Sequence, residues 1–241
     1  MKQLLIILLA TATTSGLPHH GRIFGGTPAA SGQFPFIASL NNPDQLCDAS
    51  IINKNWLLTA AHCIDLVTNT TQVLVGTNFQ HSGGTKYNIS KAIAHEGFSY
   101  NTLKNDIALI KIYGEFQFDN LVQPVEFVDP GVNQTCIAAG WGVTESVSFP
   151  EELHFVEQIA LDLELCQVII EDTESFLGSE QVCGFGVEGT GACFGDSGGP
   201  LVCDGRLGGV MSFVFGGCEQ NYPDVYTRPL DFVDWISENM K

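Results

Sequence analysis

Apolar and β-branched residues recur in short runs along the chain after residue 22. Clusters of Gly, Asn, Asp and Pro separate these runs, and such clusters favour turns. The runs lie at Phe34–Leu40, Ser50–Ile52, Gln72–Val75, Ile107–Ile112, Thr135–Ala139, Pro200–Val202 and Gly208–Phe213. Many short strands with turn signals between them predict an all-β sandwich or barrel.

The C-terminal end of the chain breaks this pattern. Leu230, Phe232, Val233, Trp235 and Ile236 fall at helical spacing, with polar residues between them. This spacing predicts an amphipathic helix that docks its apolar side on the β body.

Length and charge limit the possibilities further. The 241 residues fit one large all-β domain, and the Asp-Pro-Gly turn within Val128–Gly131 predicts a break between its two halves. With 44% hydrophobic residues, the chain can bury a sizeable core. A formal net charge of -17 disfavours binding to nucleic acid or to an anionic membrane.

The N-terminus has the pattern of a targeting segment. Lys2 precedes the apolar run Leu4–Ala10, which is too short to span a bilayer, and small residues Thr14–Gly16 follow. We interpret residues 1–16 as a secretory signal peptide cleaved near Gly16; the alternative is a buried N-terminal helix. The chain is therefore expected to be secreted and extracellular.

Two further patterns are compatible with secretion. The eight cysteines suit an oxidising compartment, although eight cysteines allow 105 pairings and the residues alone do not choose among them. Sequons at Asn69, Asn88 and Asn133 are candidate glycosylation sites.

The most specific signal is the segment Gly195–Pro200, which reads Gly-Asp-Ser-Gly-Gly-Pro. A nucleophilic serine needs backbone N–H groups directed at the developing oxyanion, and neighbouring glycines let the backbone turn tightly around it. Ser197 is therefore a candidate nucleophile. The alternative is a glycine-rich turn without a catalytic role.

Two other segments supply the partners that a serine nucleophile requires. His62, directly before Cys63, is a candidate base, although a lone histidine is more often structural. Asp106 precedes the apolar run Ile107–Ile112, where a carboxylate can accept the imidazole N–H and stabilise the imidazolium. The order His62, Asp106, Ser197 along the chain predicts a catalytic triad.

These segments, together with Arg22–Gly26, Gly140–Gly142, Ser212–Val214 and Pro223–Tyr226, resemble the chymotrypsin/trypsin family of serine endopeptidases over nearly all of residues 22–241. The resemblance implies two six-stranded antiparallel β-barrels with the active site between them, and peptide hydrolysis through an acyl-enzyme without a cofactor. It implies an oxyanion hole made by the N–H groups of Gly195 and Ser197. It also implies the disulfides Cys47–Cys63, Cys136–Cys203, Cys166–Cys183 and Cys193–Cys218.

The resemblance also implies an activation step. Residues 17–22 would be a propeptide, and an activating trypsin-like protease would cleave after Arg22. The new ammonium group of Ile23 would then pair with Asp196 and order the oxyanion hole. The protease domain would span residues 23–241.

The same resemblance places the specificity pocket. Gly191 stands at its base, where a trypsin-like enzyme would have Asp, and Ala192, Ser212 and Phe213 contribute to its walls. Val214 is expected to narrow the pocket, which favours small aliphatic substrate residues, as in elastases. Asp224 lies near the back of the pocket, and its exposure there would instead favour the broad specificity of collagenolytic members.

Two departures from the family pattern stand out. Asp48 and Ala49 replace a usual pair of glycines, near the expected leaving-group side, so specificity on that side is in doubt. Residues 76–87 contain no Asp or Glu, so no calcium site is expected there. No His/Cys spacing suggests a ligand set for another metal once the cysteines are paired. Protein or peptide substrates and protease inhibitors are the expected partners of a monomer; a non-enzymatic alternative is an inactive homologue that acts as a binding protein.

Overall fold

The computed structural model describes residues 25–42, 45–144, 150–173, 175, 177–187, 190–218 and 222–241. The predicted signal peptide and propeptide lie outside these residues, as do Arg22 and Ile23. None of the helices in the described ranges is both long enough and apolar enough to cross a lipid bilayer.

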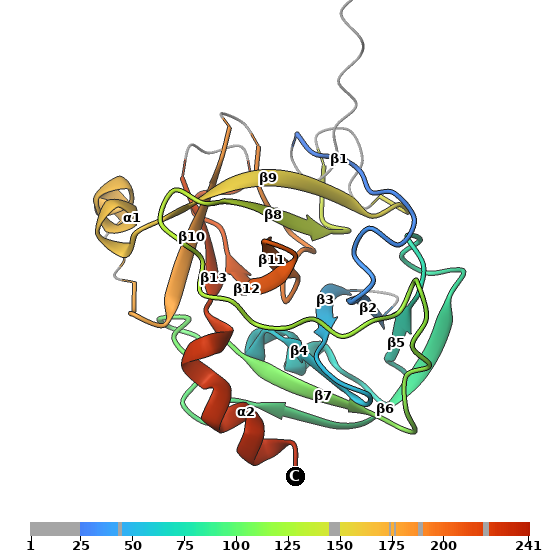
Figure 1. Ribbon diagram of the computed structural model, residues 1–241. Helices are drawn as coiled ribbons and strands as arrows, with labels where there is room; N and C mark the ends of the chain where they lie inside the picture. Colours follow the sequence, from blue (N-terminus) through green and yellow to red (C-terminus); the bar gives the residue numbers. More distant parts are fainter. Residues whose placement is uncertain are drawn as a thin grey trace, which may run out of the picture.

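The first half of the chain forms a closed antiparallel barrel in the strand order β2-β3-β4-β7-β6-β5, drawn in blue to green in Figure 1. Its strands are β2 (Ile37–Asn42), β3 (Gln45–Ile51), β4 (Trp56–Thr59), β5 (Gln72–Val75), β6 (Thr85–Ala94) and β7 (Ala108–Ile112). Closure leaves the barrel without free strand edges. Fully buried Ile51, Leu57 and Leu109 fill its interior.

The second half forms another six-stranded barrel, because β8 pairs with both β9 and β11 and thereby closes the sheet. Its strands are β8 (Thr135–Gly140), β9 (His154–Leu161), β10 (Gln181–Gly186), β11 (Pro200–Cys203), β12 (Arg206–Phe213) and β13 (Asp224–Thr227), and β1 (Thr27–Pro28) extends it by pairing with β9. The predicted pair of six-stranded antiparallel barrels is confirmed.

The predicted C-terminal helix is also confirmed. The 3-10 helix η3 (Pro229–Phe232) leads directly into α2 (Val233–Asn239). Phe232 and Ile236 form the buried face, one helical turn apart, whereas Val233 is 43% exposed. This face joins the apolar cluster of the first barrel, so the end of the chain packs back on its first half (Figure 1).

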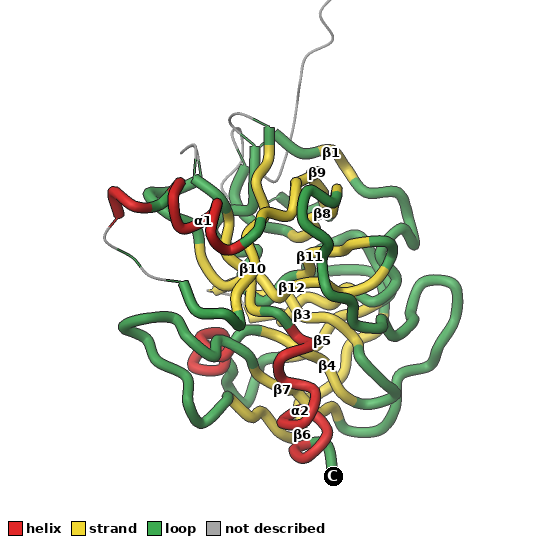
Figure 2. Tube along the Cα trace, turned by 60° about the vertical axis from the view of Figure 1, so that its left-hand side comes forward, coloured by secondary structure: helices red, strands yellow, loops and turns green. Residues whose placement is uncertain are grey.

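A second helix was not predicted. The segment α1 (Leu163–Ile169) begins at Asp162, whose side chain accepts a hydrogen bond from the Leu165 N–H at 2.7 Å. It continues into the short 3-10 helix η2 (Glu171–Thr173), and both lie at the periphery of the second barrel (Figure 2). A further 3-10 helix, η1 (Ala61–Leu66), follows β4.

The connection between the barrels occupies residues 113–134, and Val128–Gly131 lies within it. The Val128 N–H donates to the Leu207 carbonyl at 3.0 Å, which ties this connection to β12. An apolar cluster extends from the first barrel to Val202 and Leu207 of the second. The two barrels therefore share a packed surface.

Candidate active site

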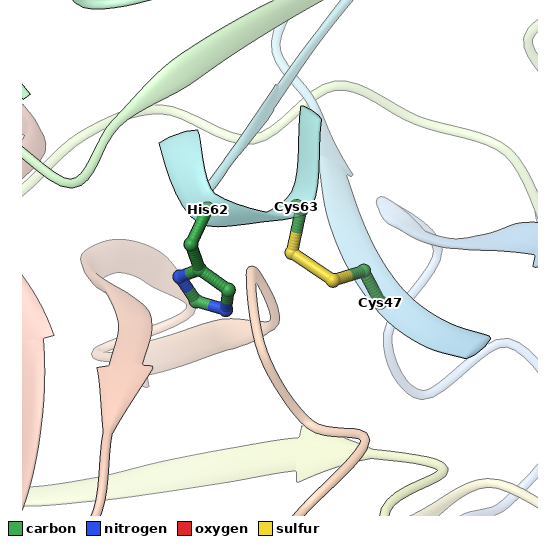
Figure 3. Close-up of side chains that lie close together, drawn as sticks. All are labelled: Cys47, His62 and Cys63. Carbon is green, nitrogen blue, oxygen red and sulfur yellow. A yellow bond between two sulfur atoms is a disulfide. The ribbon is translucent and has the colours of Figure 1, made fainter. Parts of the chain in front are cut away.

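The three triad candidates come from both barrels. His62 lies in η1, directly after β4, and Asp106 lies shortly before β7. Ser197 precedes β11 of the second barrel. The Cys47–Cys63 disulfide links β3 to η1, and the ring of His62 projects from the same turn of chain as Cys63 (Figure 3). This bridge holds the turn that presents the imidazole.

Asp106 and His62 form a closely fitted pair. Asp106 is fully buried; its Oδ1 accepts the His62 backbone N–H at 3.0 Å, and its Oδ2 lies 2.8 Å from His62 Nδ1. A carboxylate in this position favours the tautomer with hydrogen on Nδ1. The Nε2 atom is then free to act as the base.

The second barrel fixes Asp106 through two hydroxyl groups. Ser212 Oγ donates to Asp106 Oδ2 at 2.5 Å, and Thr227 Oγ1 donates to the Asp106 carbonyl at 2.9 Å. The sequence assigned Ser212 only to the substrate pocket. Its bond to the carboxylate is an additional contact that connects the pocket wall to the triad.

The loop that carries Ser197 has the shape that a nucleophile turn requires. Gly195 and Gly198 have φ angles of 103° and 77°, which glycine adopts at little cost. The Gly198 N–H donates to the Met211 carbonyl, and the Ser197 carbonyl accepts from the Asp48 N–H, both at 2.8 Å. Within the described residues, the N–H groups of Gly195 and Ser197 donate to no protein acceptor. These two donors are therefore available to an oxyanion.

Asp196 turns away from the nucleophile and into the protein. It is 2% exposed, and its two carboxylate oxygens accept the N–H groups of Gly142 at 2.7 Å and Cys193 at 2.8 Å. Burial raises the pKa of Asp196 to about 7, against the lowering effect of these two bonds. The described residues supply no cationic partner to this carboxylate.

The base of the predicted pocket contains a second buried carboxylate. A methyl group on Gly191 would lie 2.9 Å from Asp224 Oδ2, so Asp224 sits directly against the residue at the pocket base. Asp224 Oδ2 accepts the Ala192 N–H at 2.6 Å and a bond from Gln158 Nε2. Burial raises the pKa of Asp224 to about 7. Gln158, which the sequence did not single out, also accepts from Tyr226 OH at 2.8 Å.

The other predicted wall residues of the pocket, Phe213 and Val214, are only partly buried. Val214 is half-buried and packs against the apolar cluster of the second barrel, which includes Ala192. Phe213 and Phe215 line a groove of about 450 Å³ together with Leu103 and Leu177. Asn101, Thr102 and Lys104 also line this groove, so its surface is mixed in polarity.

Asp48, which together with Ala49 departs from the family pattern, is buried. Its side chain is only 1% exposed and Ala49 is fully buried, so neither can contact a substrate on the leaving-group side. The Asp48 carboxylate instead lies beneath the Ser197 loop, with Oδ2 3.4 Å from the Trp141 backbone nitrogen. The sequence left specificity on the leaving-group side open, and these two side chains are buried and not part of the surface on that side.

The structure also shows how the cysteines pair and whether the sequon asparagines are exposed. The structure contains the disulfides Cys47–Cys63, Cys136–Cys203, Cys166–Cys183 and Cys193–Cys218, the pairs that the resemblance implies. Cys47, His62 and Cys63 lie within metal-ligand distance of one another, but the two sulfurs are bonded to each other and are not available as thiolates. Asn69, Asn88 and Asn133 are all exposed.

Comparison with known proteins gives a consistent result. Residues 23–236 match the family model described as "Trypsin". The chain is 33% identical to trypsin delta of Drosophila melanogaster over 99% of this chain and 100% of that protein. It is 34% identical to the collagenase of Hypoderma lineatum over 99% of this chain and 98% of that protein. A solved structure of neuropsin, a serine protease expressed in the limbic system of mouse brain, superimposes with a TM-score of 0.81 at 28% identity, covering 90% of this chain and 99% of that one.

Proposed function

Because this chain belongs to the trypsin family of serine proteases, we propose that it is a secreted endopeptidase, made as a zymogen, that cleaves after small aliphatic residues. The single observation that carries the catalytic assignment is the buried Asp106 carboxylate, held 2.8 Å from His62 Nδ1 at the junction of the two barrels. The three segments that resemble the family's catalytic motifs support Ser197 as the third member.

In this mechanism, His62 Nε2 accepts the proton of Ser197 Oγ as the oxygen attacks the scissile carbonyl carbon. Asp106 stabilises the imidazolium that forms. The N–H groups of Gly195 and Ser197 bind the oxyanion of the tetrahedral intermediate. His62 then protonates the leaving amine, and water attacks the acyl-enzyme by the same steps in the second half of the reaction.

Activation is assigned to residues 17–23 and Asp196. Residues 1–16 are proposed as the signal peptide, and a trypsin-like protease would cleave after Arg22. The ammonium group of Ile23 would then supply the cation that the buried Asp196 carboxylate lacks among the described residues. Such a pair would hold Asp196, and with it the adjacent Gly195–Ser197 backbone, in one position.

The preference for small aliphatic residues depends on two side chains. Gly191 lacks the carboxylate that selects Arg or Lys in a trypsin-like pocket, and the branched Val214 narrows the opening. Asp224 is the opposing consideration, because it lies against Gly191 and is close to half-ionised near pH 7. The second candidate is therefore broad specificity, and the similarity to a protein named collagenase favours considering it.

A panel of peptide substrates that differ only in the residue before the scissile bond tests this proposal on protein cleaved after Arg22. Highest kcat/KM for Ala and Val is the expected result. Equal cleavage after Phe, Leu and Arg would support broad specificity instead. No cleavage of any peptide, with intact folding, would support the inactive binding homologue.

The remaining assignments follow from this function. The partners are protein or peptide substrates, an activating protease and protein protease inhibitors, with no role proposed for nucleic acid, membrane, metal or cofactor. The enzyme is proposed to act as an extracellular monomer. Asn69, Asn88 and Asn133 are proposed as glycosylation sites, and their exposure would permit attachment of glycans.

A further inference from the structure

Asp48 is a buried acid to which the proposed mechanism gives no role. It lies in β3 next to the disulfide-bonded Cys47, and its backbone N–H donates to the Ser197 carbonyl at 2.8 Å. Its Oδ2 has one long contact, 3.4 Å to the Trp141 backbone nitrogen, and its buried Oδ1 has no hydrogen-bond partner within the described chain. An ionised carboxylate would be poorly stabilised in such a place.

The nearest charged neighbour of Asp48 is another acid. A methyl group on Gly140 would collide with both Asp48 Oδ2 and Asp196 Oδ1, so the two oxygens lie together on one side of that glycine. In the part of the chain that the structure describes, no Lys, Arg or His forms an ion pair with either carboxylate. Two negative charges here would repel each other in a water-excluded space.

Hydrogen bonding decides which of the two acids bears the charge. Asp196 accepts two backbone N–H groups, at 2.7 and 2.8 Å, and such bonds favour an ionised carboxylate. Asp48 has only its long contact to Trp141. Burial, and then the charge of Asp196, raise the pKa of Asp48 well above its ordinary value.

We propose that Asp48 retains a proton at neutral pH and forms, with Asp196, a buried acid pair that carries at most one negative charge beneath the Ser197 loop, and that Asp196 is the member that ionises. The other titratable groups coupled to Asp196 are Asp224 and Tyr226 of β13, and neither is a cation. The segment that carries Trp141 and Gly142 contributes only backbone N–H groups to the pair.

The retained proton has a consequence for activation. One ammonium group balances one negative charge, so a neutral Asp48 allows the ammonium of Ile23 to neutralise Asp196 without a second uncompensated charge nearby. This consequence rests on the proposed function. The proton on Asp48 does not, because it follows from the contacts of the described residues alone.

The test is the pH dependence of unfolding for the full-length precursor and its Asp48→Asn variant, in which the side chain is nearly the same size and cannot ionise. In the unfolded chain, Asp48 has an ordinary pKa of about 3.9, so above this pH the native wild-type protein would bind one proton more than its unfolded state. Because the pKa of Asp48 is raised in the native state, its contribution to the free energy of unfolding is largest below about pH 4. This contribution is lost as the pH rises towards the pKa of Asp48 in the native state.

Denaturant titrations of both proteins at pH 5, 6 and 7 therefore have a definite expected outcome. The unfolding constant of the wild type, divided by that of the variant, should rise about tenfold per pH unit. Other groups titrate in both proteins and cancel in this ratio. Glu238→Gln, which removes an exposed carboxylate from α2, is the matched control. The unfolding constant of the wild type, divided by that of this control variant, should not change between about pH 5 and 7.

A ratio that does not change between pH 5 and 7 would overturn the proposal, because it would mean that Asp48 is ionised in the native state. Infrared spectroscopy of the wild type and a second variant, Asp48→Ala, supplies another measurement if Asp48→Asn fails to fold. Burial raises the pKa values of Asp196 and Asp224 to about 7, so these two acids also contribute to the carboxylic acid band at pH 7. A stronger band in the wild type than in Asp48→Ala is therefore the expected result, and equal bands in the two proteins would overturn the proposal. Neither measurement depends on catalysis, so an inactive enzyme would count against the proposed function and not against this proton.

Discussion

Replacement of Asp224 by Asn should make the substrate preference of the enzyme independent of pH. Asp224 lies directly against Gly191 at the proposed pocket base, and burial raises its pKa to about 7. Its ionised fraction should therefore increase from roughly a tenth at pH 6 to roughly nine tenths at pH 8. An ionised carboxylate at the base attracts a substrate Arg or Lys, whereas the neutral acid does not.

The magnitude follows from these fractions. The kcat/KM for an Arg peptide, divided by that for an otherwise identical Ala peptide, should rise about ninefold from pH 6 to pH 8, with a midpoint near 7. Effects of pH on catalysis that are common to both substrates cancel in the quotient. Asp224→Asn should give a flat quotient, and Glu238→Gln, which alters an exposed carboxylate on α2, should behave as wild type.

Steady-state kinetics with the two peptides at five pH values suffice for this test. A flat quotient in the wild-type enzyme would refute the reasoning, because it would mean that the Asp224 charge does not reach the substrate. A quotient that still rises in Asp224→Asn would assign the effect to another group.

Four other changes have definite expected outcomes. Ser212→Ala removes one hydrogen bond to the buried Asp106 and should lower kcat about twofold to tenfold in steady-state assays; unchanged kcat would show that the bond does not orient the triad. Gln158→Leu removes a donor to Asp224, so the midpoint of the Arg/Ala quotient should move above pH 7, and a lower midpoint would contradict the assigned contact. The double variant Cys193→Ser/Cys218→Ser lacks one disulfide and should have a free energy of unfolding about 2–4 kcal/mol lower than the wild type in denaturant titrations. Equal free energies of unfolding for the two proteins would contradict this. Removal of calcium with EDTA should leave Tm unchanged, because residues 76–87 offer no carboxylate, and a lower Tm would reveal a calcium site elsewhere.

Burial separates only some of the predicted strands from the missed ones, because the four-residue strands β4 and β13 are fully buried and were missed as well. Strands such as β7 and β11 are apolar runs whose residues are largely buried, so periodicity and composition both indicate them. By contrast, β6 has no fully buried residue, and backbone pairing with β5 and β7 places it in the barrel. Such pairing leaves little hydrophobic pattern in the sequence.

Helix α1 was missed for a related reason. Its buried residue is Cys166, while Leu165 and Val168 are 43% and 58% exposed. It therefore has no apolar stripe of the kind that made the C-terminal helix recognisable. The Asp162 cap is a weak signal by itself, because Asp is equally common in turns.

The site residues also fall into those that the sequence could predict and those that it could not. His62, Asp106 and Ser197 could be predicted, since each lies in a short sequence motif of its own. The contacts of Asp48 with the Ser197 loop, and of Gln158 with Asp224, join residues far apart in the chain. Only the closure of the two barrels brings these groups together, so no local pattern could have indicated them.

The central claim is that Ser197 becomes a reactive nucleophile after cleavage at Arg22. Treatment with a biotinylated organophosphonate, followed by peptide mass spectrometry, measures this directly on the cleaved chain, the uncleaved precursor and a cleaved His62→Ala variant. The account predicts a single adduct on Ser197 in the cleaved wild type, with little or none in the other two proteins. A cleaved, folded protein that forms no adduct on Ser197, or a precursor that reacts equally fast, would contradict it.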